Sequence, residues 1–144
     1  MRFAETNVLE RLPVERERTI HIPLGLLGFE RIKEYILLED PVEAPFFWLR
    51  VLANPSLGFV VMSPFSVVSD YQPDIAAEDA DYLELRGAED AFIMSIVTLG
   101  RSAQPSLNLK GPVVLNRHTM VGKQVIPLNA SEYPVQYPLP VIQE

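Results

Sequence analysis

The chain has 144 residues, of which 48% are hydrophobic and 22% charged, with a net charge of −7 and no cysteine. This composition is typical of one globular domain, which we expect over residues 1–144, and it excludes a disordered chain, a disulfide framework and thiolate metal sites. Charges run through the first twenty residues and no apolar run approaches about 18 residues, so we expect a cytoplasmic protein with no signal peptide and no membrane span.

Strand patterns begin at residue 18. Residues 18–22 alternate polar and apolar side chains, which predicts a half-buried strand with His21 facing solvent. Residues 54–56 (Asn-Pro-Ser) predict a turn. Apolar runs that indicate central strands covered on both faces lie at residues 35–38, 46–52, 57–62 and 91–99.

One helical segment follows the middle of the chain. Residues 76–85 predict that helix, with Asp74 as its N-cap. Residues 106–116 keep one alternating register that turns Asn116 outward, and Pro112 predicts an edge strand or a bulge at Gly111–Pro112. Residues 117–122 predict a hairpin connection with an exposed His118. After Tyr133, prolines predict a tail that is extended along the body or frayed.

These elements predict an all-β fold. Of the thirteen prolines, eight fall at predicted strand boundaries, namely Pro23, Pro41, Pro45, Pro55, Pro64, Pro73, Pro105 and Pro127. Several runs are apolar on both faces, as in a sheet that curls on itself. We therefore expect a single antiparallel, partly open β-barrel of about eight to ten short strands with one short inserted helix.

The net charge comes from residues 70–90. This segment holds eight of the 19 acidic residues and one of the 12 basic residues, and the remaining 11 of each kind cancel. The acids fit either the solvated face of a helix or a binding surface that attracts a basic partner and repels nucleic acid and anionic membrane. The candidate partner-binding residues are Asp70, Asp74, Glu78, Asp79 and Asp81.

The sequence contains no pattern typical of catalysis or of cofactor binding. The two histidines have no neighbours at metal-ligand spacing, and Glu78, Asp79 and Asp81 lack the spacing of a calcium loop. Gly122–Lys123 resembles the end of a phosphate-binding loop, but the preceding glycine and the following Ser or Thr are missing. We expect no catalytic residue, metal or cofactor. The aromatic residues 46–48 fit core packing better than a protein-binding hot spot.

Three groups of segments, taken together, resemble the FliW family of bacterial flagellar assembly factors. The first, IPLGLLGFE at residues 22–30, is similar to the family stretch F-P-x-G-L-P-G-F-E. The second group is PFFWLR at 45–50, LGFVV at 57–61, PF at 64–65 and DY at 70–71. The third group is NLKGPVVLN at 108–116, GKQVI at 122–126 and YP at 133–134. The chain departs from the family pattern at Leu27, Arg50, Val51, Gln136 and Tyr137.

The resemblance implies a function that composition does not supply. Proteins of this family bind CsrA, the carbon storage regulator, a small RNA-binding dimer that represses flagellin translation, and they also bind flagellin. An RNA-binding regulator presents positive charge, so it would be attracted to the acidic segment. A flagellin terminus is an amphipathic helix and would use an apolar groove or a sheet edge.

Two alternatives from other classes remain open. One is a chaperone or assembly protein that binds flagellin alone and has no part in RNA control. The other is a small barrel enzyme, for which a buried polar pocket would be the structural sign.

Overall fold

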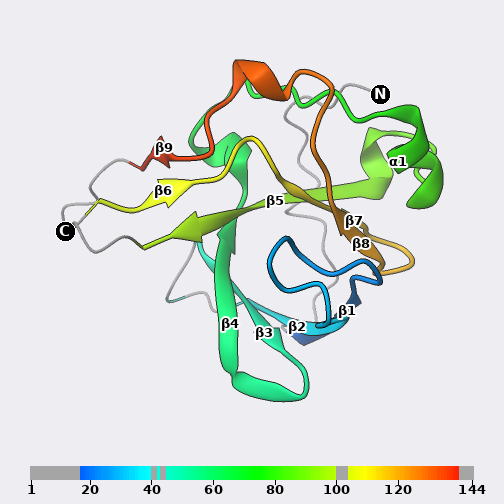
Figure 1. Ribbon diagram of the computed structural model, residues 1–144, viewed down its shortest axis with the longest axis vertical. Helices are drawn as coiled ribbons and strands as arrows, with labels where there is room; N and C mark the ends of the chain where they lie inside the picture. The colour runs from blue at the N-terminus through cyan, green and yellow to red at the C-terminus, as the bar shows by residue number, and fades with distance from the viewer. Residues whose placement is uncertain (1–16, 40–41, 43–44, 100–103, 140–144) are drawn as a thin grey trace.

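The computed structural model describes residues 17–39, 42, 45–99 and 104–139. Within them, nine strands form one antiparallel sheet, accompanied by one short α-helix and several 3-10 turns (Figure 1). The helix α1 is Ala77–Tyr82. The strands are β1 Glu17–His21, β2 Glu34–Glu39, β3 Phe47–Val51, β4 Asn54–Met62, β5 Ala91–Thr98, β6 Ser106–Leu107, β7 Val113–Asn116, β8 Gly122–Gln124 and β9 Tyr137–Pro138.

The sheet curls without closing. Strands β1 to β5 are paired in chain order, and β5 then pairs with β7 along its first half and with β6 near its end. β7 continues to β8, and β6 continues to β9. One isolated parallel bridge between His21 and Val121 joins the end of β1 to the start of β8. The predicted partly open antiparallel barrel with one short helix is confirmed.

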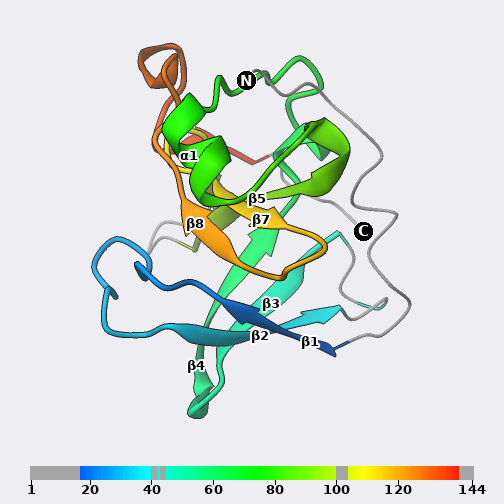
Figure 2. The same ribbon diagram turned by 90° about the vertical axis from the view of Figure 1, so that its right-hand side faces the viewer.

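Two hydrophobic cores lie on opposite faces of β5 and β7. Phe92, Met94 and Leu115 point into the core enclosed by β1 to β4. Ile93 and Val114 point into a second core, which α1 and the segments on either side of it cover (Figure 2). Because successive strand residues point to opposite faces, β5 is buried throughout its first five residues.

The prediction of a central strand covered on both faces is therefore confirmed for β5, and it is wrong for the other apolar runs. β2 buries Tyr35 and Leu37, and β3 buries Leu49 and Val51, whereas the other residues of both strands are half-buried or exposed. The first five residues of β4 are exposed, because they belong to a hairpin that extends beyond the barrel (Figure 1). The apolar residues at 57–59 are thus not part of a doubly covered strand.

The predicted turn at residues 54–56 is wrong. The chain turns at Leu52 and Ala53, and Asn54 already pairs with Val51. The next ladder pair joins Arg50 to Gly58, so Pro55 and its neighbours form a bulge. The Arg50 guanidinium supports the bulge by donating to the Pro55 carbonyl at 3.0 Å.

The predicted single strand at residues 106–116 is also wrong. The Asn108 side-chain oxygen accepts hydrogen bonds from the Lys110 and Gly111 backbone N–H groups, and this local turn interrupts the register. Residues 108–112 therefore leave the ladder, and β6 and β7 pair separately with β5. In place of the edge strand or bulge predicted at Gly111–Pro112, the ladder is interrupted from residue 108 to residue 112.

The helix is shorter than predicted, and Asp74 is not its N-cap. The cap position is Ala76, which makes no side-chain hydrogen bond there. The Asp74 backbone instead donates to the Asn129 side chain at 2.8 Å and accepts from the Leu128 N–H at 2.7 Å. The helical segment ends before Glu84, whose φ of 57° is left-handed and incompatible with continuing the helix.

The tail after Tyr133 is extended as far as the structure describes it. β9 pairs with β6, and Leu139 is buried in the second core. The extended alternative is therefore confirmed up to Leu139, and residues 140–144 lie outside the described residues.

Two glycines in the loop between β1 and β2 allow a matched stability test. Gly25 and Gly28 both have positive φ, but only at Gly25 would a Cβ fall 2.7 Å from the Glu30 carbonyl; at Gly28 it would meet nothing within 4 Å. We expect Gly25→Ala to lower the free energy of unfolding by more than about 2 kcal/mol and Gly28→Ala by about 1 kcal/mol. Urea denaturation measures both. Equal losses would show that the close approach at Gly25 contributes nothing.

Candidate functional site

The acidic segment wraps the outer side of the second core. The structure places α1 and its flanking loops at the surface, where Asp70, Glu78 and Asp81 are exposed and Asp74 is half-buried. These four carboxylates can meet a partner from solvent. The fifth candidate, Asp79, cannot, because it is buried.

Asp79 attaches the helix to the sheet. Its carboxylate pairs with the Lys123 ammonium on β8, and the same ammonium lies 5.5 Å from the centre of the Tyr82 ring. A buried carboxylate needs such a partner, since its desolvation would otherwise be costly. Asp79 therefore serves to hold α1 against β8, and the exposed acids beside it are fixed in position.

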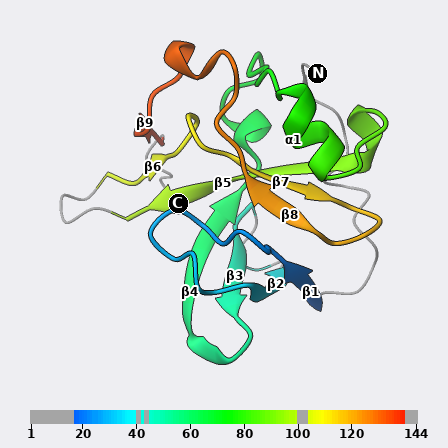
Figure 3. The ribbon, with the colours of Figure 1, turned by 45° about the vertical axis from the view of Figure 1, so that its right-hand side comes forward.

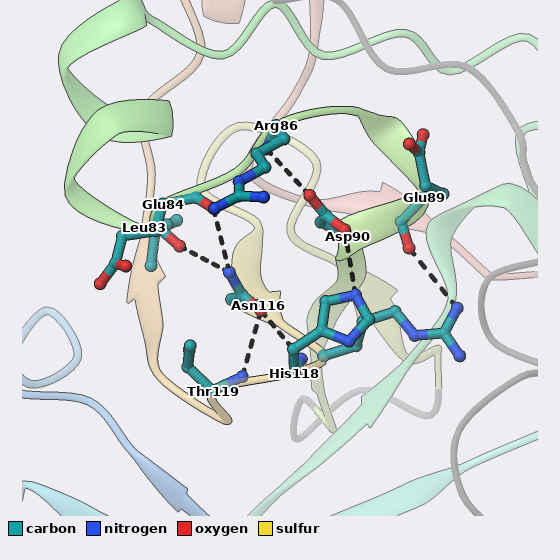
Figure 4. A network of polar contacts seen from close by, with 9 residues as sticks. Leu83, Glu84, Arg86, Glu89, Asp90, Asn116, His118 and Thr119 are labelled. Atoms are coloured by element: carbon teal, nitrogen blue, oxygen red, sulfur yellow. Dashed lines mark hydrogen bonds and ion pairs between the residues drawn. The ribbon is translucent and has the colours of Figure 1, made fainter.

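A polar pocket of about 600 Å³ lies between the end of α1, the loop that follows it and the turn from β7 to β8 (Figure 4). Three carboxylates reach it, together with one guanidinium and one imidazole. Of these, only Asp81 was among the residues singled out from the sequence. The lining residues are Asp81, Glu84, Leu85, Arg86, Asp90, Asn116, His118 and Thr119.

Asn116 holds the elements around this pocket together. The prediction that its side chain faces outward is wrong. Its side chain is buried, with 3% of the residue exposed, and its amide donates to the Leu83 carbonyl at 2.8 Å. Its side-chain oxygen accepts from the His118 and Thr119 backbone N–H groups. Figure 4 shows how this one residue joins the end of α1 to the turn after β7.

Asp90 forms a second link across the pocket. One carboxylate oxygen accepts from the Arg86 backbone N–H at 2.9 Å, and the other lies 3.0 Å from His118 Nε2. The Arg86 hydrogen bond, with a further contribution from His118, lowers the pKa of Asp90 below its usual value. The predicted exposure of His118 and of His21 is confirmed, and His21 lies 3.4 Å from Glu34.

The pocket does not have the arrangement that the enzymatic alternative requires. That alternative expects a buried polar pocket, whereas His118 at this rim is 64% exposed. The polar atoms of Asn116 and Asp90 are occupied by hydrogen bonds that hold loops together. Among the described residues, no group of three or more His, Asp or Glu side chains could hold a metal ion, and no helix is long and apolar enough to cross a membrane.

The aromatic residues 46–48 serve mainly as core. Phe47 packs edge-on against Phe92 with ring centres 6.0 Å apart, and Phe46 packs against the second core. Core packing is thus confirmed for these two rings. Trp48 is half-buried, and the Arg50 guanidinium lies 4.6 Å from its ring centre.

The departures from the family pattern fall in different environments. Leu27 is exposed, and its backbone N–H donates to the Gln124 side chain at 2.8 Å. Val51 is buried in the barrel core, Gln136 is exposed and Tyr137 belongs to β9. Of these departures, Leu27 and Gln136 therefore change the exposed surface.

Comparisons with known proteins agree on one family. The family model described as FliW protein matches residues 4–139. The flagellar assembly factor FliW of Natranaerobius thermophilus is 34% identical over 130 residues, covering 89% of this chain and 85% of the relative. That of Geobacter sulfurreducens is 33% identical over 134 residues, covering 92% and 83%. A crystal structure of the flagellar assembly factor FliW matches with a TM-score of 0.74 and 31% identity, covering 83% of this chain and 84% of that chain.

The hydrogen bonds of Asn116 predict a large stability effect. Asn116→Ala leaves the Leu83 carbonyl and two backbone N–H groups without their partner, so we expect a loss of about 2–3 kcal/mol in the free energy of unfolding. Asn116→Asp keeps the acceptor but replaces the donor, and we expect a similar loss at neutral pH. Denaturant unfolding of both variants measures this, and an Asp variant as stable as wild type would contradict the donor's role.

The lowered pKa of Asp90 predicts a pH-dependent contribution to stability. A carboxylate with a lowered pKa stabilises the fold above its ordinary pKa of 3.8, and that contribution disappears as the pH falls through the lowered value. The stability gap between wild type and Asp90→Asn should therefore be full at pH values well above 3.8 and shrink as the pH falls below that value. Glu89→Gln, at the exposed neighbouring position, is the control. A gap that stays constant over this range would show that Asp90 is not the titrating group.

Proposed function

The chain belongs to the FliW family of flagellar assembly factors, and from this premise we propose that it binds and antagonises the RNA-binding translational regulator CsrA and also binds flagellin. It would do so in the cytoplasm, without catalysing a reaction. Through the two partners it would couple the amount of flagellin to flagellin translation. The observation that carries the proposal is the acidic surface built on α1 and its flanking loops.

The arrangement of the charges supports a basic partner. Glu78 and Asp81 are exposed on α1, and Glu84 is exposed at the pocket beside them. Lys123, the base on the adjoining strand, is already paired with Asp79 and so does not neutralise these carboxylates. A protein that binds RNA phosphates must be basic, so this surface would speed its encounter and, once bound, repel RNA.

The two binding activities give a switch. While flagellin is abundant in the cell it occupies the factor, and CsrA remains free to repress translation. After flagellin is exported, the factor becomes available to capture CsrA. The linkage needs only that binding one partner weakens binding of the other.

A second candidate function is a chaperone that binds flagellin and takes no part in RNA control. Exposed leucines at the surface favour it, because they suit an apolar helix better than a basic regulator: Leu27 and Leu128 are each about two-thirds exposed. Separate titrations with CsrA and with flagellin from the same genome distinguish the two functions, since a protein that is only a flagellin chaperone would not bind CsrA.

Charge reversal on α1 tests the acidic surface. We expect Glu78→Lys combined with Asp81→Lys to weaken CsrA binding on the order of tenfold or more, because both side chains are exposed and lie on the acidic face. The affinity of the unmodified protein should also fall as salt is raised. Calorimetric titration at two salt concentrations measures both effects.

The matched control is Glu34→Lys combined with Glu39→Lys. Both residues are exposed on β2, outside the acidic segment, and this variant changes the net charge by the same amount. It should bind CsrA nearly as wild type does. If CsrA binds tightly and its affinity is unchanged by salt and by both double variants, the electrostatic mechanism is rejected. If the wild-type protein does not bind CsrA, the antagonist function itself is rejected.

A further inference from the structure

Three exposed apolar side chains form a strip beside the acidic surface. Leu27 is 67% exposed, Ile126 53% and Leu128 68%. We call these three residues the apolar strip. They come from the loop between β1 and β2, which lies beside β8 in Figure 3, and from the segment that follows β8.

Hydrogen bonds place Leu27 next to the segment that carries Ile126 and Leu128. Leu27 donates its backbone N–H to the Gln124 side chain at 2.8 Å, and Gln124 donates onward to the Gly111 carbonyl at 3.0 Å. Ile126 extends over Gly111, where a Cβ would lie 3.6 Å from its terminal methyl carbon. Leu27 and Ile126 therefore border the same glutamine, and Leu128 follows two residues further along the chain.

The strip is held rigidly although it is exposed. Burial alternates after β8: Val125, Pro127 and Asn129 are buried, and Ile126 and Leu128 between them are exposed. The backbone is fixed at both ends, since Val125 N–H donates to the Pro112 carbonyl at 2.9 Å and Leu128 N–H to the Asp74 carbonyl at 2.7 Å. Because the exposed residues of this segment alternate with buried ones, and hydrogen bonds hold its backbone at Val125 and Leu128, Ile126 and Leu128 make a fixed apolar ledge.

Acidic residues border one side of this ledge. The hydrogen bond from Leu128 places Asp74 directly next to the strip. The Asp79–Lys123 ion pair places α1, with exposed Glu78, against the strand residue adjacent to Gln124. A partner that covers the strip would therefore bring its own flank against carboxylates, which favours a flank with positive charge.

We propose that the apolar strip is a docking surface for an amphipathic helix whose apolar stripe is bordered by lysine or arginine. Such a helix presents side chains at i, i+3, i+4 and i+7 along one face, so it can cover a row of exposed apolar side chains. Flagellin is the partner in the proposed function that carries an amphipathic terminal helix, so the identity of the natural occupant rests on that function. The surface itself rests on the geometry alone.

The test uses a helical peptide of leucine and lysine that displays a leucine stripe flanked by lysines, and a scrambled peptide of equal composition. Wild type should bind the striped peptide, with backbone amide shifts concentrated at residues 124–128, and bind the scrambled peptide at least tenfold more weakly. Leu27→Gln combined with Leu128→Gln should lose at least tenfold in affinity for the striped peptide and for monomeric flagellin. Both side chains are largely exposed, so the fold should be unaffected.

The control variant is Leu57→Gln combined with Leu99→Gln, which removes two exposed leucines elsewhere on the sheet. It should bind both probes as wild type does. Equal losses in the two double variants, or amide shifts away from the strip, overturn the proposal. If the striped peptide binds at the strip while flagellin and CsrA do not bind, the proposed function fails and the docking surface stands.

Discussion

The structure depends on the burial of β5 and β7 on both faces. Phe92 and Met94 turn toward the barrel, and Ile93 turns toward the core beneath α1. Each fully buried side chain of this size contributes about 1.5–3 kcal/mol to the free energy of unfolding. Because β5 and β7 supply side chains to both cores, the two cores depend on each other for stability. The acidic segment is part of the cover of the second core. Its exposed charges therefore have fixed positions although the segment contains little regular structure.

Buried polar groups hold α1 in position against the sheet. α1 has six residues and no side-chain cap, and a helix this short is not stable alone. The Asp79–Lys123 pair holds it to β8, and the Asn116 amide holds its final carbonyls to the turn after β7. Because of these contacts, Asp79 and Asn116 are not available to bind a partner. The same contacts hold the segment in place, so the remaining carboxylates face solvent at fixed positions.

The sequence predicted the elements that depend on local pattern and missed those that depend on distant partners. The apolar run at residues 91–99 indicated a buried strand because both of its faces are apolar. Asn116 lies in an alternating register that turns it outward, yet it is buried because it bonds to Leu83, 33 residues earlier. Asp74 resembles a helix cap, but its backbone bonds to Leu128 and Asn129 instead. The Leu83 partner of Asn116 and the Leu128 and Asn129 partners of Asp74 are all distant in sequence, so the residues around Asn116 and Asp74 do not reveal them.

The two proposed surfaces differ in the range over which they act. The carboxylates on α1 act across roughly the 8 Å Debye length of physiological solution, so they govern how fast a basic partner arrives and in which orientation. The apolar strip acts only on contact, since it must lose water to contribute, and it governs how long a partner stays. Because Leu128 and Asp74 are joined by a backbone hydrogen bond, the two surfaces share an edge. A partner that covers that edge therefore meets both, and two partners of ordinary interface size would compete there even if their main contacts differ.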